Sequence, residues 1–174
     1  MSAWKELEKV ISPHVLEDAR RVSAALVELG IPHALVGGLA VGIHGYPRVT
    51  KDVDFLVGPE AFAETEPLLR FRDELADVVR WGVIDLIAAL PEDPILAGEV
   101  RHGSVDAIPV AGIEVLVVMK LRAGRTQDTA DVEALVRAGA DVASIVDFIK
   151  RFEPQHLAEF SAIAQRGLKP TDSK

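Results

Sequence analysis

The 174-residue chain contains no cysteine, which excludes disulfide bonds, thiolate metal sites and thiol nucleophiles. The side chains that remain for metal binding are its carboxylates and five histidines. Aromatic residues make up only 5% of the sequence, so a core has to be built mainly from aliphatic side chains. A chain of this length usually forms one compact unit.

Long apolar runs are also absent. No apolar stretch approaches the roughly 18 residues that a membrane span requires. The N-terminal segment MSAWKELEKV is charged, whereas a secretion signal has a basic start followed by an apolar core. We therefore expect a cytoplasmic protein without a membrane partner, and the sequence leaves open whether it forms a homodimer.

Positive charge is in short supply as well. The chain has 19 Lys and Arg residues against 27 Asp and Glu residues, which gives a formal net charge of −8. Broad nucleic-acid surfaces depend on Lys and Arg to neutralise phosphates. Such a surface is not expected here, and any contact with RNA would have to be local.

Apolar periodicity and glycine or proline punctuation predict an α+β fold. Ser12 and Pro13 have the pattern of a helix start, and Gly30 ends that helix. Strands are expected over residues 34–36, 53–57 and 83–87, short helices over 39–44 and from Pro59 to about residue 69, and weaker strands over 78–81, 104–108 and 112–116.

The C-terminal third has a helical pattern throughout, with glycine and proline between the segments. The expected helices cover residues 117–123, 129–138, 142–152 and 155–166. We therefore divide the chain into a core over residues 1–116, a helical segment packed on that core over 117–167, and a disordered tail over 168–174.

Two carboxylates, Asp52 and Asp54, stand at the start of the second expected strand. Because strand side chains alternate between faces, both would point the same way. Mg²⁺ is held by one or two such carboxylates together with waters and substrate phosphates. The alternative is that Asp52 caps a loop and Asp54 is simply solvated.

A glycine pair, Gly37-Gly38, follows the first expected strand and precedes a short helix. Glycines in this setting let backbone N–H groups approach a phosphate. A tight turn that needs positive φ is the other explanation for such a pair. Arg48 and Thr50 come next on the approach to the two carboxylates, where they could steer phosphate or simply be exposed loop residues.

The segment Leu35-Val-Gly-Gly-Leu-Ala, followed by Arg48-Val-Thr-Lys-Asp-Val-Asp-Phe, resembles the signature of DNA polymerase β-type nucleotidyltransferases, and most closely the small bacterial AbiEii-like and DUF-type proteins. A second segment, from Lys120 through Arg125 to Asp131-Val, resembles the helical part that follows the core in those proteins. The resemblance implies a nucleotidyltransferase fold, with a mixed β-sheet and helices packed on one face.

The resemblance also implies a site. Asp85 would join Asp52 and Asp54 as the third catalytic, metal-binding carboxylate, with Mg²⁺ or Mn²⁺ as cofactor, and could accept the proton of the acceptor hydroxyl. Lys120 and Arg125 would lie near the nucleotide phosphates, although salt bridges to Asp128 or Asp131 explain them equally well.

The implied activity is transfer of an NMP from an NTP to a hydroxyl group on RNA or protein, as in toxin–antitoxin systems. Two alternatives remain open: a small-molecule adenylyltransferase of the antibiotic-modifying kind, and a nucleotide-binding module without turnover. Many active members have Gly-Ser in the phosphate loop, whereas Gly38 offers only its backbone. This difference weakens the inference of turnover more than that of binding.

Overall fold

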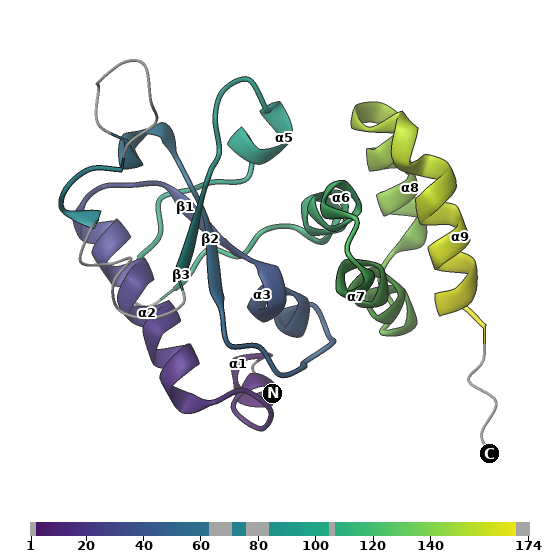
Figure 1. Cartoon of the computed structure of the whole chain (residues 1–174), viewed down its shortest axis with the longest axis horizontal. Coiled ribbons are helices and arrows are strands. Elements are labelled where there is room, and N and C mark those ends of the chain that lie inside the picture. The colour runs from purple at the N-terminus through teal and green to yellow at the C-terminus, as the bar shows by residue number, and fades with distance from the viewer. Residues whose placement is uncertain (1–2, 63–70, 76–83, 105–106, 170–174) are drawn as a thin grey trace.

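The computed structural model describes residues 3–62, 71–75, 84–104 and 107–169 (Figure 1). Three strands form its sheet: β1 (His33–Val36), β2 (Val53–Val57) and β3 (Ile84–Ala88). The helices are α1 (Ala3–Leu7), α2 (Pro13–Glu28), α3 (Gly37–Ile43), α5 (Pro94–Ala97), α6 (Ile113–Ala123), α7 (Thr126–Arg137), α8 (Val142–Phe152) and α9 (Leu157–Gly167), with short 3-10 helices η1 (Pro59–Ala61) and η2 (Pro154–His156).

The sheet is mixed, as the sequence predicted, and the fold is α+β. Its strand order is β1-β2-β3; β2 runs antiparallel to β1 and parallel to β3. The register sets Val36 beside Asp54 and Asp54 beside Asp85. Strand neighbours in register point to the same face of a sheet, so these three side chains share one face.

Helices pack on both faces of this sheet, and the expectation of helices on one face was wrong. Leu35 and Phe55 contribute to an apolar cluster that contains α1 and α2. Ala34 and Leu56, which point the other way, join a cluster that includes α3 and α6. Figure 1 shows α2 on one side of the strands and α3 and α6 on the other. All four residues of β1 are buried, and three successive apolar residues, Ala34–Val36, are typical of a strand covered on both faces.

Two of the expected weaker strands differ from the structure. Residues 113–116 form the first turn of α6, with Gly112 at the N-cap, instead of a strand. An apolar run of this kind fits a buried helix and a buried strand equally well. In the 104–108 segment, Ser104 and Ala107 form only an isolated bridge, and residues 105 and 106 lie outside the described residues.

Other expectations fall partly or wholly beyond the described part of the chain. The helix expected after Pro59 begins as η1, and residues 63–70 are outside the description. The strand expected over residues 78–81 and the end of the tail, residues 170–174, are outside it too. By contrast, α2 and α8 agree closely with their predicted bounds, and Gly30 ends α2 with a positive φ of 67°.

The C-terminal helices share a core with the sheet. One apolar cluster runs from Val36 and Leu56 in the strands through Leu116 in α6 to Ile149 in α8 and Phe160 in α9. In Figure 1, α8 and α9 lie farthest from the sheet, on the far side of α6 and α7. None of the helices in the described residues has both the length and the apolar character needed to cross a membrane.

Candidate functional site

Three carboxylates gather at one pocket of about 390 Å³. Asp54 in β2 and Asp85 in β3 are directly paired and point to the face covered by α3 and α6. Asp52, one residue before β2, lines the same pocket. The structure therefore brings together the three acidic residues that the sequence singled out.

Asp54 has the most perturbed surroundings of the three. Its partial burial, followed by the charges of Asp85 and Asp52, raises the pKa of its carboxyl above the ordinary value, and Lys120 and Arg125 oppose this only in part. Within the described residues, no hydrogen bond or ion pair reaches the Asp54 carboxylate. The negative charge at this point is thus incompletely balanced by the protein.

Gly37 lies directly against the Asp54 carboxylate. Its φ is +64°, and a Cβ built on it would lie 1.7 Å from Oδ2 of Asp54. Any side chain here would adopt a strained backbone conformation and overlap the carboxylate. Glycine at this position therefore allows β2 to present Asp54 beside the start of α3.

At Gly38, unlike Gly37, the constraint is the space around the residue and not its backbone conformation. Its φ is not positive, but an added Cβ would lie 2.8 Å from Oγ1 of Thr50 and 3.5 Å from Nη2 of Arg48. The loop that leads from α3 to β2 thus packs over the first turn of α3. As a result, Gly37, Gly38, Arg48 and Thr50 all line the carboxylate pocket.

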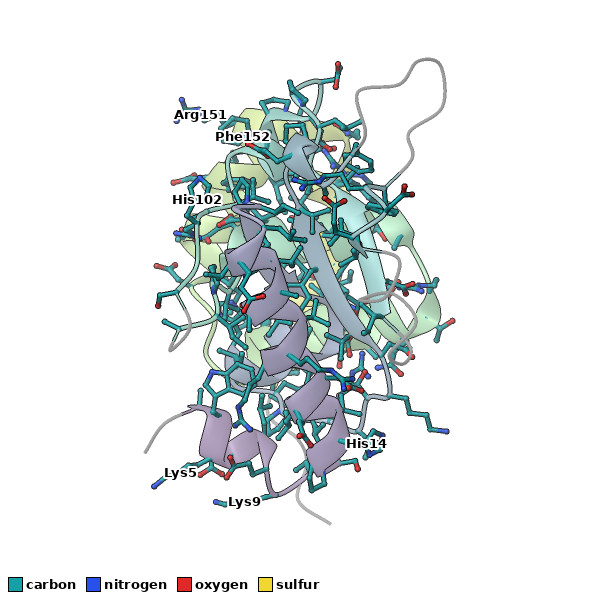
Figure 2. All side chains as sticks on the ribbon, turned by 90° about the vertical axis from the view of Figure 1, so that its left-hand side faces the viewer. Lys5, Lys9, His14, His102, Arg151 and Phe152 are labelled. Carbon is teal, nitrogen blue, oxygen red and sulfur yellow. The ribbon has the colours of Figure 1, made fainter. Side chains whose placement is uncertain are left out.

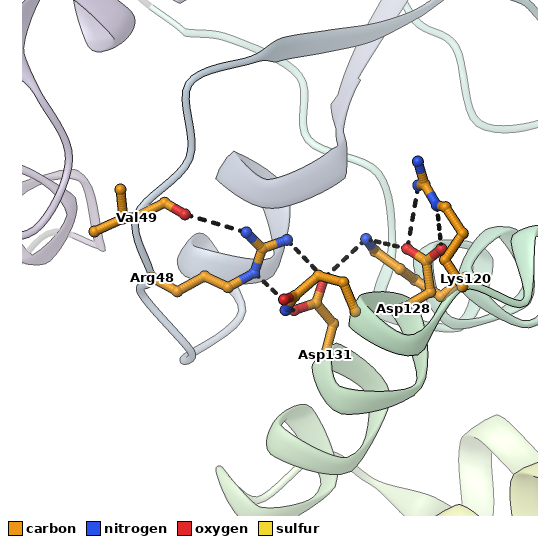
Figure 3. Close-up of polar contacts among 7 residues, drawn as sticks. Arg48, Val49, Lys120, Asp128 and Asp131 are labelled. Carbon is orange, nitrogen blue, oxygen red and sulfur yellow. Dashed lines mark hydrogen bonds and ion pairs between the residues drawn. The ribbon is translucent and has the colours of Figure 1, made fainter.

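The wall of the pocket opposite the sheet carboxylates comes from α6 and the start of α7. Lys120 in α6 and Arg125, directly before α7, pair there with two buried aspartates (Figure 3). Nζ of Lys120 lies 2.8 Å from Oδ1 of Asp128 and 2.8 Å from Oδ2 of Asp131. Arg125 donates from Nε to Oδ2 of Asp128 at 2.6 Å, and its side chain is 75% exposed. Both cations predicted to meet phosphate therefore line the pocket while already forming ion pairs.

Arg48 connects the two walls of the pocket. Its Nε and Nη2 donate to the two carboxylate oxygens of Asp131, at 2.7 and 2.8 Å, and Gln127 donates to Oδ1 at 2.8 Å. Burial alone would raise the pKa of Asp131, but the hydrogen bonds from Arg48, Lys120 and Gln127 outweigh it and hold that pKa below its ordinary value. This fork-to-fork pair ties the loop before β2 to α7.

Sequence reasoning missed part of this wall. It proposed Asp131 as a partner for Lys120 or Arg125 but not for Arg48, and it did not anticipate the apolar surface formed by Ile87, Leu116 and Met119. A usable signal was present, because aspartates within an apolar helix need cationic partners. Neither His44 nor Tyr46 is among the described residues that line the pocket, and His44 hydrogen-bonds through Nε2 to the carbonyl oxygen of Ala111 at 2.8 Å.

The oxygen donors suit a hard divalent cation such as Mg²⁺ or Mn²⁺. The described residues contain no group of three acidic or histidine side chains already arranged to hold a metal ion, so Asp52, Asp54 and Asp85 share a pocket without closing around a centre. Mg²⁺ normally completes its shell with waters and substrate phosphates, and the incompletely balanced charge at Asp54 fits such a partial protein site.

The pocket is thus lined by carboxylates, by the glycine backbone at the start of α3 and by cations, which suits a ligand with several anionic groups. The apolar side chains in its lining suit the uncharged part of such a ligand. The pocket's volume of about 390 Å³ lies within the range of about 300 to 1,000 Å³ that is usual for pockets that bind small organic molecules. No protein-family model matches this chain, and no match was found among functionally characterised proteins.

Proposed function

We propose that this chain is a nucleotidyltransferase that moves an NMP group from an Mg²⁺-bound NTP to an acceptor hydroxyl. One observation carries the proposal: Asp54 and Asp85 share a sheet face at a pocket whose far wall holds Lys120 and Arg125. Carboxylates that attract a cation and cations that attract phosphate are the two halves of a metal–triphosphate site.

The order of elements supports a nucleotidyltransferase fold for the core. A buried strand, β1, leads through Gly37-Gly38 into α3, the next strand carries Asp54, and its parallel neighbour carries Asp85. This arrangement agrees with the resemblance found in the sequence. The third carboxylate comes from a segment far along the chain from the first two, so local sequence similarity alone does not explain the convergence.

The reaction would be a displacement at the α-phosphorus. The acceptor oxygen forms a bond to this phosphorus, the bond to the oxygen that bridges the α- and β-phosphorus breaks, and pyrophosphate leaves with that oxygen. The hydroxyl proton passes to a carboxylate, for which Asp85 is the candidate. When bound, Mg²⁺ would neutralise charge on the phosphates and align them.

The protein's own part is mainly positioning. Gly37 and Gly38 would offer backbone amides to the phosphates, while Arg48 and Thr50 border the same space. Lys120 is held by two aspartates, so it would meet the triphosphate in a fixed position. The apolar surface of Ile87, Leu116 and Met119 is available to the ribose or base.

A nucleotide-binding module without turnover is the second candidate, and specific observations favour it. Gly38 has no hydroxyl to contact phosphate, and the charges of Lys120 and Arg48 are already balanced by buried aspartates. Such a site could bind Mg²⁺-NTP without positioning it for transfer. The two candidates differ in pyrophosphate release.

The test incubates the purified chain with each of the four α-labelled NTPs and Mg²⁺ or Mn²⁺, alone and with chelator. The melting temperature of a transferase rises when metal and NTP are both present, because a ligand that binds only the folded state stabilises that state. A transferase also releases pyrophosphate and labels an added acceptor. A module shows the first effect only.

Absence of any gain in melting temperature with all four metal–NTP pairs would exclude both candidates. A gain of equal size without metal would reject the carboxylates as a metal site while leaving nucleotide binding in place.

A further inference from the structure

A second cavity, of about 740 Å³, lies on the other side of the loop that carries Thr50. Residues 9–12 and 49–51 line it together with His14, Val15 and Asp18. Thr50 lines both cavities, so this groove, which we call the Val49 groove, adjoins the carboxylate pocket. Figure 2 shows Lys9 and His14 at the end of the molecule where α1 leads into α2.

The floor of the Val49 groove is aliphatic. Ile11 and Val15 are almost fully buried beneath it, while Val10 is 39% exposed and Val49 is 69% exposed. An exposed valine between Arg48 and Thr50, in a loop tied down by the Arg48–Asp131 pair, contributes nothing to the core. Together these side chains offer a firm apolar contact surface to a ligand.

The rim of the groove is positively charged on balance. Asp18 is engaged by Arg21, and Lys9 by Glu6. Lys51 is exposed and has no ion-pair partner within the described residues, and the imidazole of His14 accepts or donates one hydrogen bond with Ser12. Lys51 is therefore available to an anionic group on a ligand that lies along Val49.

We propose that the Val49 groove holds the acceptor of the reaction, and that this acceptor is a peptide segment in which a Ser, Thr or Tyr hydroxyl is flanked by an aliphatic and an acidic residue. This inference rests on the proposed function. The aliphatic residue would lie on Val10 and Val49, the acidic residue would pair with Lys51, and the hydroxyl would reach past Thr50 to the carboxylate pocket.

The chemistry of the groove favours a peptide over the other acceptors. Single-stranded RNA binds on aromatic platforms along a basic track, whereas no Phe, Tyr or Trp is among the described residues that line this groove, and the chain is acidic overall. A cationic aminoglycoside needs an acidic pocket, and the free charge here is Lys51. An extended peptide can use the apolar floor and the lysine at once.

The transfer reaction is chemically balanced with a peptide hydroxyl as the acceptor. The side-chain oxygen of the peptide bonds to the α-phosphorus of the NTP, pyrophosphate leaves, and the hydroxyl proton passes to a pocket carboxylate. The product is a phosphodiester-linked nucleotidyl peptide, and no oxidant or reductant is involved.

The experiment measures labelling of short acetylated peptides by α-labelled NTP and Mg²⁺. One set carries an aliphatic residue, a central hydroxyl residue and a glutamate, and a matched set replaces glutamate by lysine. A short RNA with a free 3′ hydroxyl and an aminoglycoside are the competing acceptors. Variants Val49→Asp and Lys51→Glu alter the groove, while Leu168→Asp and Lys150→Glu make the same changes at exposed positions elsewhere, since Leu168 is 64% exposed.

We expect the glutamate peptides to be labelled, and Val49→Asp to raise their KM by about tenfold or more, without a change in the melting-temperature gain from Mg²⁺-NTP. Lys51→Glu should reverse the preference so that the lysine peptides are labelled better. The Leu168→Asp and Lys150→Glu controls should behave as the unaltered protein. Reversal by Lys51→Glu is a result that a merely structural role of the loop would not produce.

Four outcomes would overturn the inference. Labelling of RNA or aminoglycoside but of no peptide rejects the peptide acceptor, and peptide labelling with unchanged KM in both groove variants rejects the groove. If Mg²⁺-NTP raises the melting temperature but nothing is labelled and no pyrophosphate is released, the chain is a module without turnover, and the proposed transfer fails together with the acceptor inference. If Mg²⁺-NTP has no effect on stability, the proposed function fails and the acceptor inference fails with it.

Discussion

Two pairs of aspartates lie on the two sides of the candidate pocket, one on the sheet and one in α7, and their surroundings are opposite. Asp128 and Asp131 in α7 are almost completely buried, and each has at least two hydrogen-bond donors from cationic or amide side chains. Asp54 and Asp85 on the sheet are more accessible, and no described cation forms an ion pair with Asp54. The molecule balances the charge of one pair with its own side chains and leaves the other pair to attract a partner.

The difference separates two uses of the same residue type. A buried aspartate that is surrounded by donors fixes neighbouring elements relative to one another, and its loss leaves cations unpaired. An aspartate whose pKa is raised by burial and by like charges stores repulsion that a bound cation would relieve.

Asp54→Asn should have the largest effect. If the proposed function holds, nucleotidyl transfer should fall roughly a thousandfold, equivalent to about 4 kcal/mol of transition-state stabilisation, because a carboxylate of the proposed metal site loses its charge. Metal-free stability should stay level or rise, since repulsion with Asp52 and Asp85 is relieved. Transfer rates and melting temperatures would be measured with and without Mg²⁺-NTP.

The matched control for this change is Asp147→Asn, which removes the same charge from an exposed position in α8. An Asp54→Asn protein that melts lower than the control and still gains stability from Mg²⁺-NTP would make Asp54 a structural residue and reject the central assignment.

Asp131→Asn should show the reverse pattern. The change weakens the bidentate pair with Arg48 and removes a partner of Lys120 in a buried setting, so we expect a loss of about 3 kcal/mol in the free energy of unfolding. Chemical denaturation would measure this loss. If instead stability is retained while transfer is lost, Asp131 belongs functionally with Asp54, and the contrast between the two pairs disappears.

Gly37→Ala should cost about 2 kcal/mol of stability, because it imposes a positive φ on a residue with a side chain and forces the Asp54 carboxylate to move. Thermal melting of Gly37→Ala and of the double variant with Asp54→Ala would separate the two causes. Truncating Asp54 should recover the part that comes from overlap, whereas the strain remains. No recovery would mean that the two residues are not in contact.

The pH dependence of stability should differ in sign between Asp131 and Asp54. The pKa of Asp131 is lowered from 3.8, so its stabilising contribution is complete above that value and is lost as the pH falls through the folded-state pKa. The pKa of Asp54 is raised, so in the metal-free protein its unfavourable contribution grows as the pH rises from 3.8 through the higher folded-state pKa. Melting curves of the Asp54→Asn and unaltered proteins should therefore converge as the pH approaches 3.8 from above.

Arg125→Gln should have the smallest effect on stability, below about 0.5 kcal/mol, since the arginine side chain is 75% exposed and its ion pair is screened by solvent. Its effect on the affinity for Mg²⁺-NTP should exceed its effect on stability. Isothermal titration with a non-hydrolysable NTP analogue would compare them, and equal affinity in the variant would remove Arg125 from the phosphate-binding set.

Much of the sheet-side half of the site was predictable because it depends on short stretches of sequence. Alternation along one strand sets Asp52 and Asp54 toward one pocket, and a glycine pair after a buried strand predicts a close backbone approach. Asp85 required the resemblance, since nothing in its own neighbourhood specifies which strand lies beside it. The parallel pairing of β2 and β3 provides that information only in the folded chain.

The helical half was harder to predict. The pairing of Arg48 with Asp131 joins residues 83 positions apart, and sequence periodicity carries no information on such distant partners. The coverage of both sheet faces was also missed, although the apolar residues 34–36 of β1 indicated it. Residues 113–116 were misassigned because a short run of β-branched and aliphatic residues suits a buried helix as well as a strand.

The link between Arg48 and Asp131 also has a consequence for the time at which the pocket first exists. A ribosome releases the chain from its N-terminus, and the carboxylates of β2 emerge well before α7. Until Asp131 is available, the loop from Arg48 to Asp52 has no anchor on the far wall, and Lys120 lacks both of its acidic partners. A nascent chain would therefore hold its acidic strand without the cationic wall. The proposed nucleotide binding should begin only when synthesis has passed α7, and for most of its translation the chain would lack a complete pocket.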